Sequence, residues 1–365
     1  AKTRVTDQIL QPPLSAASGF TSQWINAGTL SNSAFEVSLS MPIITTKNLN
    51  YTARATFDRI RSVVSELSVP AYTFGSGAQG GEGTFRIETG VPYGTMYGRK
   101  FVRECSELPR GFVEQCGGSG QAFQKNRDGL IVWTGAGNEL TDGVTKNLWN
   151  STLQAPQAPW GVAAAWGHPM VQRDTMFALN NAGLVQPVGN VLPQYRWSTA
   201  HTLSYKRLTL NGLVDASVGR SVHNQGLGWA LLDFLYVDAD QAGQTTATAL
   251  PQSYYYRAGP PDNGNGIGGL YDVLAPNGFS VEKASFARLR ELVARYDIGR
   301  IGGVGNWNVS LIGRNLYTWT KYRGFDPEVG IQGNTGQAGS GVLNAVDNFT
   351  FPNIRTVTFS LGTSF

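Results

Sequence analysis

The sequence has little charge, few cysteines and no long uninterrupted apolar run. Charged residues make up 15% of its 365 residues, whereas ordinary soluble proteins have about 25%. A helix that crosses lipid needs about 20 mostly apolar residues. The most apolar charge-free stretch, 175–195, is interrupted by Asn180, Asn181, Pro187, Asn190 and Pro193. These absences exclude membrane-spanning helices, and they argue against a disordered chain, a coiled coil and a standard cytosolic enzyme.

Motifs for catalysis, cofactors and metals are also missing. The sequence has no GxSxG, HExxH or catalytic cysteine pattern. Residues 264–269 satisfy GxGxxG but follow Pro-Pro-Asp-Asn rather than a strand, so we do not expect nucleotide binding. Asp262 and nearby asparagines lack a bidentate acidic partner for Ca²⁺, which favours a flexible turn. His168, His201 and His223 do not have metal-ligand spacing. We therefore expect a protein that is not an enzyme and has no cofactor or metal.

The small net charge and the two cysteines also restrict the possible functions. The net charge is +4, and no run of five or more basic residues occurs, so no nucleic-acid partner is expected. Cys105 and Cys116 form neither a CxxC motif nor part of a Cys/His cluster. The polar residues between them predict a loop disulfide, typical of an oxidising compartment. Two unpaired thiols are the alternative.

What the sequence does contain is apolar alternation with period two. From 208 to 218, Leu208, Leu210, Val214, Ala216 and Val218 occupy one face and mainly polar residues the other. Similar alternation runs through 35–41, 49–57, 195–205 and 307–311. These lengths approach the 9–11 residues with which a tilted strand crosses lipid. One-sided sheets in water alternate in the same way, so the pattern alone leaves both environments open.

Two further features favour a membrane. Aromatic residues lie at strand ends, as at Tyr195 and Tyr205, where the lipid interface would be. The connections also differ in length, because Lys206 and Arg207 alone link two strands while the segments near 104–128 and 240–280 are long. The sequence therefore predicts an all-β fold, an antiparallel transmembrane β-barrel, with about ten strands in this chain and long extracellular loops at those two segments.

The C-terminus gives the sharpest local signal. Residues 355–365 alternate and end on an aromatic residue, with Val357, Phe359, Leu361 and Phe365 in the apolar positions. Such a last strand resembles the signal by which barrel assembly machinery recognises outer-membrane proteins. An ordinary edge strand that ends on phenylalanine is the alternative.

Several segments resemble one receptor family. Residues 284–292 read ASFARLREL and are followed by Tyr296. Their apolar spacing also fits an amphipathic helix, but they look like a strand of SusC/RagA-type TonB-dependent receptors. Residues 313–329, GRNLYTWTKYRGFDPEV, and 351–356, FPNIRT, are similar to motifs of the same family. The resemblance is dense over 281–365 and sparser upstream, at 6–10, 19–20 and 26–28.

The resemblance implies a large outer-membrane importer. Such receptors have a 22-stranded barrel with an N-terminal plug, take up oligosaccharides or peptides, pair with a SusD-like surface lipoprotein, and draw energy from TonB–ExbB–ExbD through the plug. Residues 1–365 then correspond to the C-terminal part of the barrel, without the plug. A smaller barrel that closes by itself is the structural alternative. A barrel scaffold for surface assembly without active transport, and a secreted glycan-binding β-protein, are the functional alternatives.

The resemblance and the loops supply the candidate site residues. The motif residues expected to be structural are Arg314, Asn315, Leu316, Tyr322, Gly324, Asp326, Pro327 and Glu328. Asp326 and Glu328 are interpreted as pairing with nearby Arg or Lys at the barrel rim, with a substrate role as the alternative. Aromatic candidates for ligand contact in the loops are Trp133, Trp149, Trp160, Trp166, Tyr254, Tyr255 and Tyr256. Packing within the loops or an aromatic girdle is the alternative for each of these.

Overall fold

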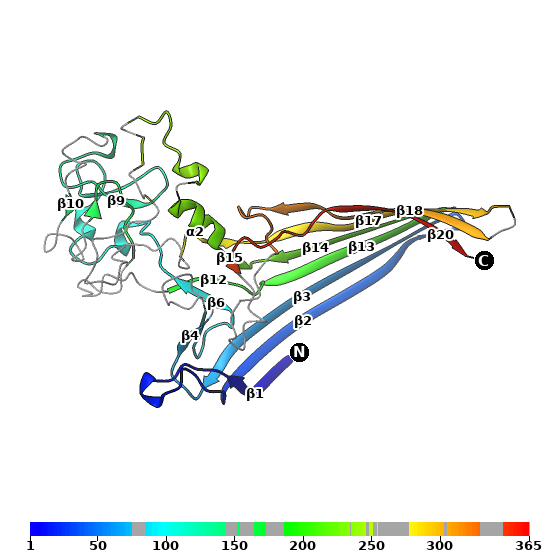
Figure 1. Cartoon of the computed structure of the whole chain (residues 1–365), viewed down its shortest axis with the longest axis horizontal. Helices are drawn as coiled ribbons and strands as arrows, with labels where there is room; N and C mark the ends of the chain where they lie inside the picture. The colour runs from blue at the N-terminus through cyan, green and yellow to red at the C-terminus, as the bar shows by residue number, and fades with distance from the viewer. Residues whose placement is uncertain are drawn as a thin grey trace.

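A long curved sheet makes up much of the chain, and a small lobe, formed by residues 99–142, 164–172 and 254, lies at one end of it (Figure 1). The computed structural model describes residues 1–74, 85–142, 152–153, 164–172, 186–233, 235–245, 248–250, 254, 277–302, 305–328 and 346–364. Among these, no helix combines the length and apolar character needed to cross a bilayer.

The large sheet has eight strands, close to the number expected from the alternation. They are β1 (Lys2–Leu10), β2 (Ile25–Thr45), β3 (Leu49–Leu67), β13 (Tyr195–Tyr205), β14 (Leu208–Val218), β17 (Phe286–Arg300), β18 (Asn306–Thr320) and β20 (Thr356–Ser364). Their spatial order follows the chain, and every neighbouring pair is antiparallel. The segment with helical spacing is strand β17, so the sheet context overrides its periodicity. At the two edges, β1 and β20 pair with no further described strand.

Connection lengths differ between the two ends of the sheet. At one end, residues 46–48 join β2 to β3, Lys206 and Arg207 join β13 to β14, and residues 301–305 join β17 to β18. Lys206 adopts a left-handed φ of 50°, which lets the chain reverse within two residues. The opposite end carries the long segments 68–194, 219–285 and 321–355. The lobe lies at this second end (Figure 1).

The register sorts the side chains of the sheet onto two faces. Leu208 pairs with Tyr205 and Tyr296, and Leu311 pairs with Ala294 and Phe359, so apolar residues share one face. This apolar face is exposed. Its large exposed residues include Phe35, Val37, Leu39, Met41, Leu292, Tyr296, Leu311, Val357, Phe359 and Leu361. The opposite, polar face carries residues such as Thr56 and Ser198, which hydrogen-bond to each other.

The lobe and its surroundings contain shorter elements. One sheet has the order β12 (Gln186–Asn190), β6 (Thr95–Gly98), β5 (Phe85–Ile87) and β4 (Tyr72–Phe74). The other short strands are β7 (Cys116–Gly117), β8 (Phe123–Lys125), β9 (Ile131–Trp133), β10 (Thr152–Leu153), β11 (Ala164–Ala165), β15 (Ser221–Asn224), β16 (Val281–Lys283) and β19 (Val346–Asp347). Helix α2 covers Gln225–Leu232, and 3-10 turns cover Ala16–Ser18, Cys105–Glu107, Val113–Gln115, Leu140–Asp142 and Val237–Ala239.

The residues of the lobe share an apolar core. The buried members of this core are Phe101, Val102, Leu108, Ala122, Phe123, Leu130, Ile131, Trp133, Trp166, Met170, Val171 and Tyr254. The predicted disulfide between Cys105 and Cys116 is present, and both cysteines pack against this core. The lobe therefore buries its apolar side chains in the ordinary way, unlike the sheet.

Candidate functional site

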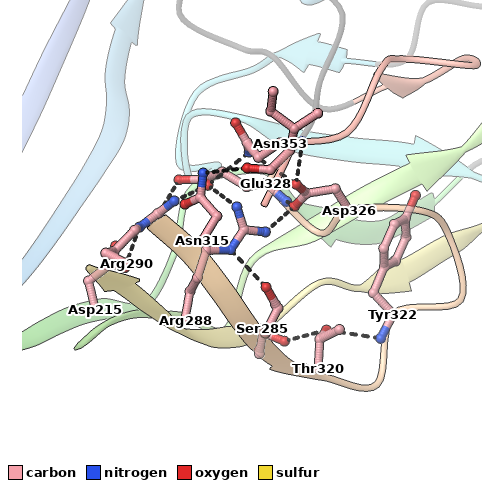
Figure 2. Close-up of polar contacts among 12 residues, drawn as sticks. Asp215, Ser285, Arg288, Arg290, Asn315, Thr320, Tyr322, Asp326, Glu328 and Asn353 are labelled. Atoms are coloured by element: carbon pink, nitrogen blue, oxygen red, sulfur yellow. Dashed lines mark hydrogen bonds and ion pairs between the residues drawn. The ribbon is translucent and has the colours of Figure 1, made fainter. Parts of the chain in front are cut away.

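A cluster of ion pairs joins β14, β17 and residues 326–328 (Figure 2). It lies on the polar face of the sheet, because Arg288 is in the same row as Asp215 and Ser198. Its basic members, Arg288 and Arg290, lie near the beginning of β17. Arg288 stands opposite Asp215 of β14, whereas Arg290 sits at a bulge, because the register with β14 steps from Leu289 directly to Glu291. A bulge redirects the side chain at that point of a strand. Both guanidinium groups thereby reach the carboxylate of Glu328.

Arg288 and Arg290 bind acidic residues from two other elements. Arg288 pairs with Asp326, and its Nη1 lies 2.9 Å from Oε2 of Glu328. Arg290 Nη1 donates to Glu328 Oε2 at 2.6 Å, and its Nη2 donates to Asp215 Oδ2 at 3.0 Å. Glu328 thus bridges the two arginines, in the charge-assisted geometry that gives the strongest hydrogen bonds. We call these five residues the ion cluster.

Asp326 also anchors the segment that leads into the last strand. Its Oδ2 accepts hydrogen bonds from the backbone N–H and the side-chain amide of Asn353, each at 3.0 Å. The backbone N–H of Glu328 donates to its Oδ1 at 2.9 Å. Burial alone would raise the pKa of Asp326, but the hydrogen bonds from Arg288 and these N–H groups hold that pKa below its ordinary value. The carboxylate therefore stays charged and joins β17 to the start of β20.

Tyr322 and Gly324 fix the path of the chain before Asp326. The Tyr322 hydroxyl donates to Oδ2 of Asp347 at 2.8 Å, and its backbone N–H donates to Oγ1 of Thr320 at 3.1 Å. A Cβ at Gly324 would lie 2.4 Å from the Tyr322 ring, so only glycine fits there. Pro327 is buried between the two acidic residues. These contacts hold residues 322–328 against the sheet.

The other motif residues lie along β18. Arg314 Nε is 3.2 Å from Oε2 of Glu291, in an ion pair that is largely exposed. Asn315 has a φ of 50°, and its side-chain amide donates to the Ile354 carbonyl at 3.2 Å. The Leu316 side chain would come within 2.8 Å of a Cβ at Gly313. Most of the motif residues thus lie toward one end of the sheet, where their contacts connect β17, β18 and the residues that lead into β20.

The described loop aromatics lie inside the lobe. Trp133, Trp166 and Tyr254 are all buried in its core. The Tyr254 hydroxyl donates to Oδ2 of Asp128 at 2.8 Å and accepts from Asn126. In this structure the three rings pack the lobe and do not form an open surface. Trp149, Trp160, Tyr255 and Tyr256 lie outside the described residues.

The C-terminal signal residues lie on the apolar face of β20. Val357, Phe359 and Leu361 are 66%, 69% and 57% exposed. Phe365 lies outside the described residues.

Sequence reasoning missed the specific partners within the ion cluster. Asp215, Arg288, Arg290 and Asn353 were not singled out as site residues, although Arg288 and Arg290 stand in the motif that suggested the family. An available signal was Asp215, an acidic residue in an otherwise uncharged alternating strand. In the described part of the chain, no group of three or more His, Cys, Asp or Glu side chains is placed to hold a metal ion.

Comparison with known proteins supports the resemblance drawn from the motifs. No family model matches the chain. The TonB-dependent receptor P26 of Formosa agariphila is 24% identical over 368 residues, which cover 99% of this chain and 32% of the relative. The TonB-dependent receptor P3 of the same organism is 24% identical over 377 residues, covering 99% and 31%. The chain thus spans about a third of the length of the curated relatives that it matches.

Solved structures agree at the level of the fold. A structure of the RagAB peptide transporter matches with a TM-score of 0.57 and 18% identity, covering 99% of this chain and 32% of that one. The RagAB peptide importer in its open-open state matches with a TM-score of 0.55 and 18% identity, covering 100% and 32%. The chain is therefore similar, over nearly its whole length, to a third of a SusC/RagA-like TonB-dependent receptor.

Proposed function

We propose that this chain forms part of the barrel wall and cell-surface loops of an outer-membrane receptor that imports nutrients. The observation that carries the proposal is the single-layer sheet with an exposed apolar face, on which Phe35 and Phe359 are 60% and 69% exposed. An exposed apolar surface of this extent drives association in water, whereas the lipid around a barrel solvates it. The similarity to TonB-dependent receptors supports the same assignment.

β1 and β20 have no further pairing partner among the described strands, which supports a larger wall. Hydrocarbon offers no hydrogen-bond partner to an unpaired strand, so only closed barrels span membranes as sheets. The eight-stranded order leaves one edge at each end of this sheet. Further strands of a larger barrel would pair with both edges.

The relatives suggest the energy source, the partner and the cargo. Two relatives are named as TonB-dependent, which supports energy from TonB–ExbB–ExbD. The solved neighbours are named as a peptide transporter and importer, RagAB. We infer peptides or oligosaccharides as cargo and a SusD-like surface lipoprotein as the partner. The apolar face would contact outer-membrane lipids, and the last strand would engage the barrel assembly machinery.

The ion cluster would give this wall a rigid rim. It links β14, β17 and residues 326–328 through one buried and two half-buried ion pairs, and the lead-in to β20 through the hydrogen bond from Asn353 to Asp326. Each of its three carboxylates is already paired with Arg288 or Arg290, so we assign the cluster a structural role. Cargo would instead meet the loops at the same end of the sheet.

Site-specific labelling tests the topology. Asp238 near the lobe end and Lys47 at the hairpin end are both exposed and lie at opposite ends of the sheet. A membrane-impermeant thiol reagent should label Asp238→Cys in intact cells, and Lys47→Cys only after the outer membrane is permeabilised. The native cysteines remain silent because they are joined in a disulfide. Equal labelling of both variants in intact cells, or release of the protein without detergent, would overturn the proposal.

Uptake measurements separate import from the scaffold alternative. Cells that carry the protein should accumulate labelled peptides or oligosaccharides, and deletion of TonB should abolish this accumulation. A structural scaffold would remain in the membrane, and accumulation would be independent of TonB. That second result would favour the scaffold role.

A further inference from the structure

The apolar face of the sheet changes character along β1, β2 and β3 toward the lobe end. Paired residues in neighbouring strands share a face, which allows the rows to be read from the register. Val37 pairs with Phe57, and in the next row of this face Phe35 pairs with Arg59. Beyond them, Ser33 pairs with both Arg61 and Lys2. The face therefore passes from aliphatic, through aromatic, to basic within three rows.

Aromatic rings mark the transition. The ring centroids of Phe35 and Phe57 are 6.2 Å apart, and those of Phe57 and Tyr195 are 5.7 Å apart. A band of aromatic residues between an apolar surface and charged residues is typical of the level where lipid tails meet headgroups. Arg59 and Arg61 thus stand at headgroup height if the sheet spans a bilayer as proposed.

The charge at this level is not balanced by the protein. Within the described residues, the side chains of Arg59, Arg61 and Lys2 form neither a hydrogen bond nor an ion pair. By contrast, Arg4 in the next row is paired with Glu66, and Arg196 on the polar face is paired with Asp58 at 3.0 Å. The basic residues of the apolar face are left exposed to whatever surrounds the sheet.

Two hollows adjoin these basic side chains. One, of about 630 Å³, is lined by Phe57, Arg59, Arg61, Tyr93 and Tyr195 among others. The second, of about 450 Å³, is lined by Lys2, Arg4 and Arg61 among others. Arg61 lines both, so the two hollows are neighbours along the sheet.

Strand lengths explain why the first hollow exists. β3 continues to Leu67, but its neighbour β13 begins only at Tyr195, which lies level with Arg59. Beyond that point, the partner of β3 is the segment around Tyr93, whose N–H donates to the Ser62 carbonyl at 2.9 Å. The first hollow therefore lies where the pairing of β3 with β13 ends and its pairing with the segment around Tyr93 begins.

We propose that these hollows bind the phosphate-bearing headgroup of an anionic lipid, with its acyl chains lying over the apolar face below Phe35. Guanidinium groups bind phosphate oxygens in a two-point geometry, which suits Arg59 and Arg61. The continuity from basic to aromatic to aliphatic rows matches the order of groups along one lipid molecule. The inference rests on the proposed membrane location and adds a lipid site to it.

The test measures lipid retained by the membrane-inserted protein. The protein is reconstituted in nanodiscs of phosphatidylcholine with a minor fraction of a phosphorylated anionic lipid, and native mass spectrometry counts the anionic lipid that stays bound. Removing one basic group near a membrane surface lowers binding about five-fold. Arg59→Gln with Arg61→Gln should therefore lower retention roughly thirty-fold, and lysine at both positions should restore much of it.

Arg54→Gln is the matched control. Arg54 is exposed and lies on the same strand, but it pairs with Ser40 on the polar face. It should change retention less than two-fold. Equal losses for both variants, or no loss for the Arg59 and Arg61 variant, would overturn the lipid site while leaving the membrane location intact.

Two further arms identify the source of the phosphate. The same lipid without its phosphate should be retained no better than phosphatidylcholine. Free inorganic phosphate at the same concentration should fail to displace the phosphorylated lipid; displacement would assign the site to a soluble anion and overturn the lipid proposal. A protein that does not enter the nanodisc at all would overturn the proposed function and this inference together.

Discussion

The apolar face of the sheet and the core of the lobe place the same kinds of side chain in opposite surroundings. Phe359 on β20 is 69% exposed, whereas Phe123 on β8 is 1% exposed. Leu39 on β2 is 51% exposed, whereas Ile131 on β9 is 1% exposed. All four residues lie in β-strands, so secondary structure does not account for the difference.

This difference in exposure indicates the solvent in which each region is stable. In the lobe, apolar side chains leave water by packing on one another, which is the main stabilising effect in a soluble domain. In the sheet, one layer of strands satisfies its backbone hydrogen bonds and leaves its apolar side chains outside, which is stable when lipid surrounds it. Under the proposed function, the boundary between the two solvents runs across this chain, near Phe35, Phe57 and Tyr195.

Loss of Arg288 should produce the largest loss of stability, because this residue pairs with a buried carboxylate in the ion cluster. Arg288 and Asp326 are 2% and 3% exposed, so Arg288→Met leaves a buried carboxylate without its main partner. We expect a loss of about 3–5 kcal/mol in the free energy of unfolding. Guanidinium unfolding of the protein in lipid vesicles measures it.

Arg314→Met is the control for this prediction. Its ion pair with Glu291 is largely exposed, and exposed pairs contribute about 0–1 kcal/mol. Equal losses for the two variants would show that the cluster is not effectively buried in the membrane-inserted protein.

A charge on the apolar face should produce the next largest effect. Leu39 lies on this face between the aromatic row at Phe35 and the turn at 46–48. Arginine near the middle of a bilayer costs about 2–4 kcal/mol, so Leu39→Arg should destabilise the vesicle-inserted protein by that amount.

Ser38→Arg is the matched substitution on the polar face. Ser38 pairs with Thr56 and is next to Leu39 in the chain. Its arginine should cost less than about 1 kcal/mol, because charges on the lumen side remain hydrated. The reverse order of the two costs would mean that the faces have been assigned the wrong way round.

Removal of the disulfide should affect only the lobe. Cys105 and Cys116 are 11 residues apart in sequence, and a crosslink over such a loop contributes about 2–3 kcal/mol in the chain-entropy account. Replacing both with serine should speed hydrogen exchange at Phe123 and Ile131 in the lobe. Exchange in β14 should stay unchanged, and faster exchange there would show that the lobe and the sheet unfold together.

Apolar alternation predicts the strands best where the two faces of the sheet contact different solvents. The expected strands 195–205 and 208–218 agree with β13 and β14 at both ends. The expected strands 35–41 and 49–57 are shorter than β2 and β3. Above the aromatic row, residues such as Arg61 and Ser62 are both polar, so the alternation disappears although the backbone pairing continues.

The ion cluster was harder to predict because it depends on a bulge. The sequence indicates that Asp326 and Glu328 need basic partners, but not which arginine supplies the charge. Arg288 and Asp326 are 38 residues apart, and the bulge at Arg290 brings its side chain to Glu328. Alternation assumes an unbroken register, so it cannot locate this convergence.

The smallest expected effect is a pH dependence at His223, between the sheet and the lobe. His223 lies on β15 in the small sheet with β16 and β19, and its ring nitrogens have no hydrogen-bond partner among the described residues. Burial lowers its pKa from 6.5 to about 4. The unfolded chain therefore binds a proton below about pH 6.5 that the folded chain refuses until about pH 4, and stability falls as the pH drops through this window.

The expected loss is up to about 1.4 kcal/mol at pH 5.5, relative to pH 7.5, in the free energy of unfolding. His223→Gln should remove this slope. Asp347 on β19 acts in the opposite direction, since burial raises the pKa of its carboxyl group. The slope therefore has to be read as the difference between the wild type and His223→Gln. An identical slope in both proteins would mean that His223 is solvated, and that the water-excluding boundary lies elsewhere.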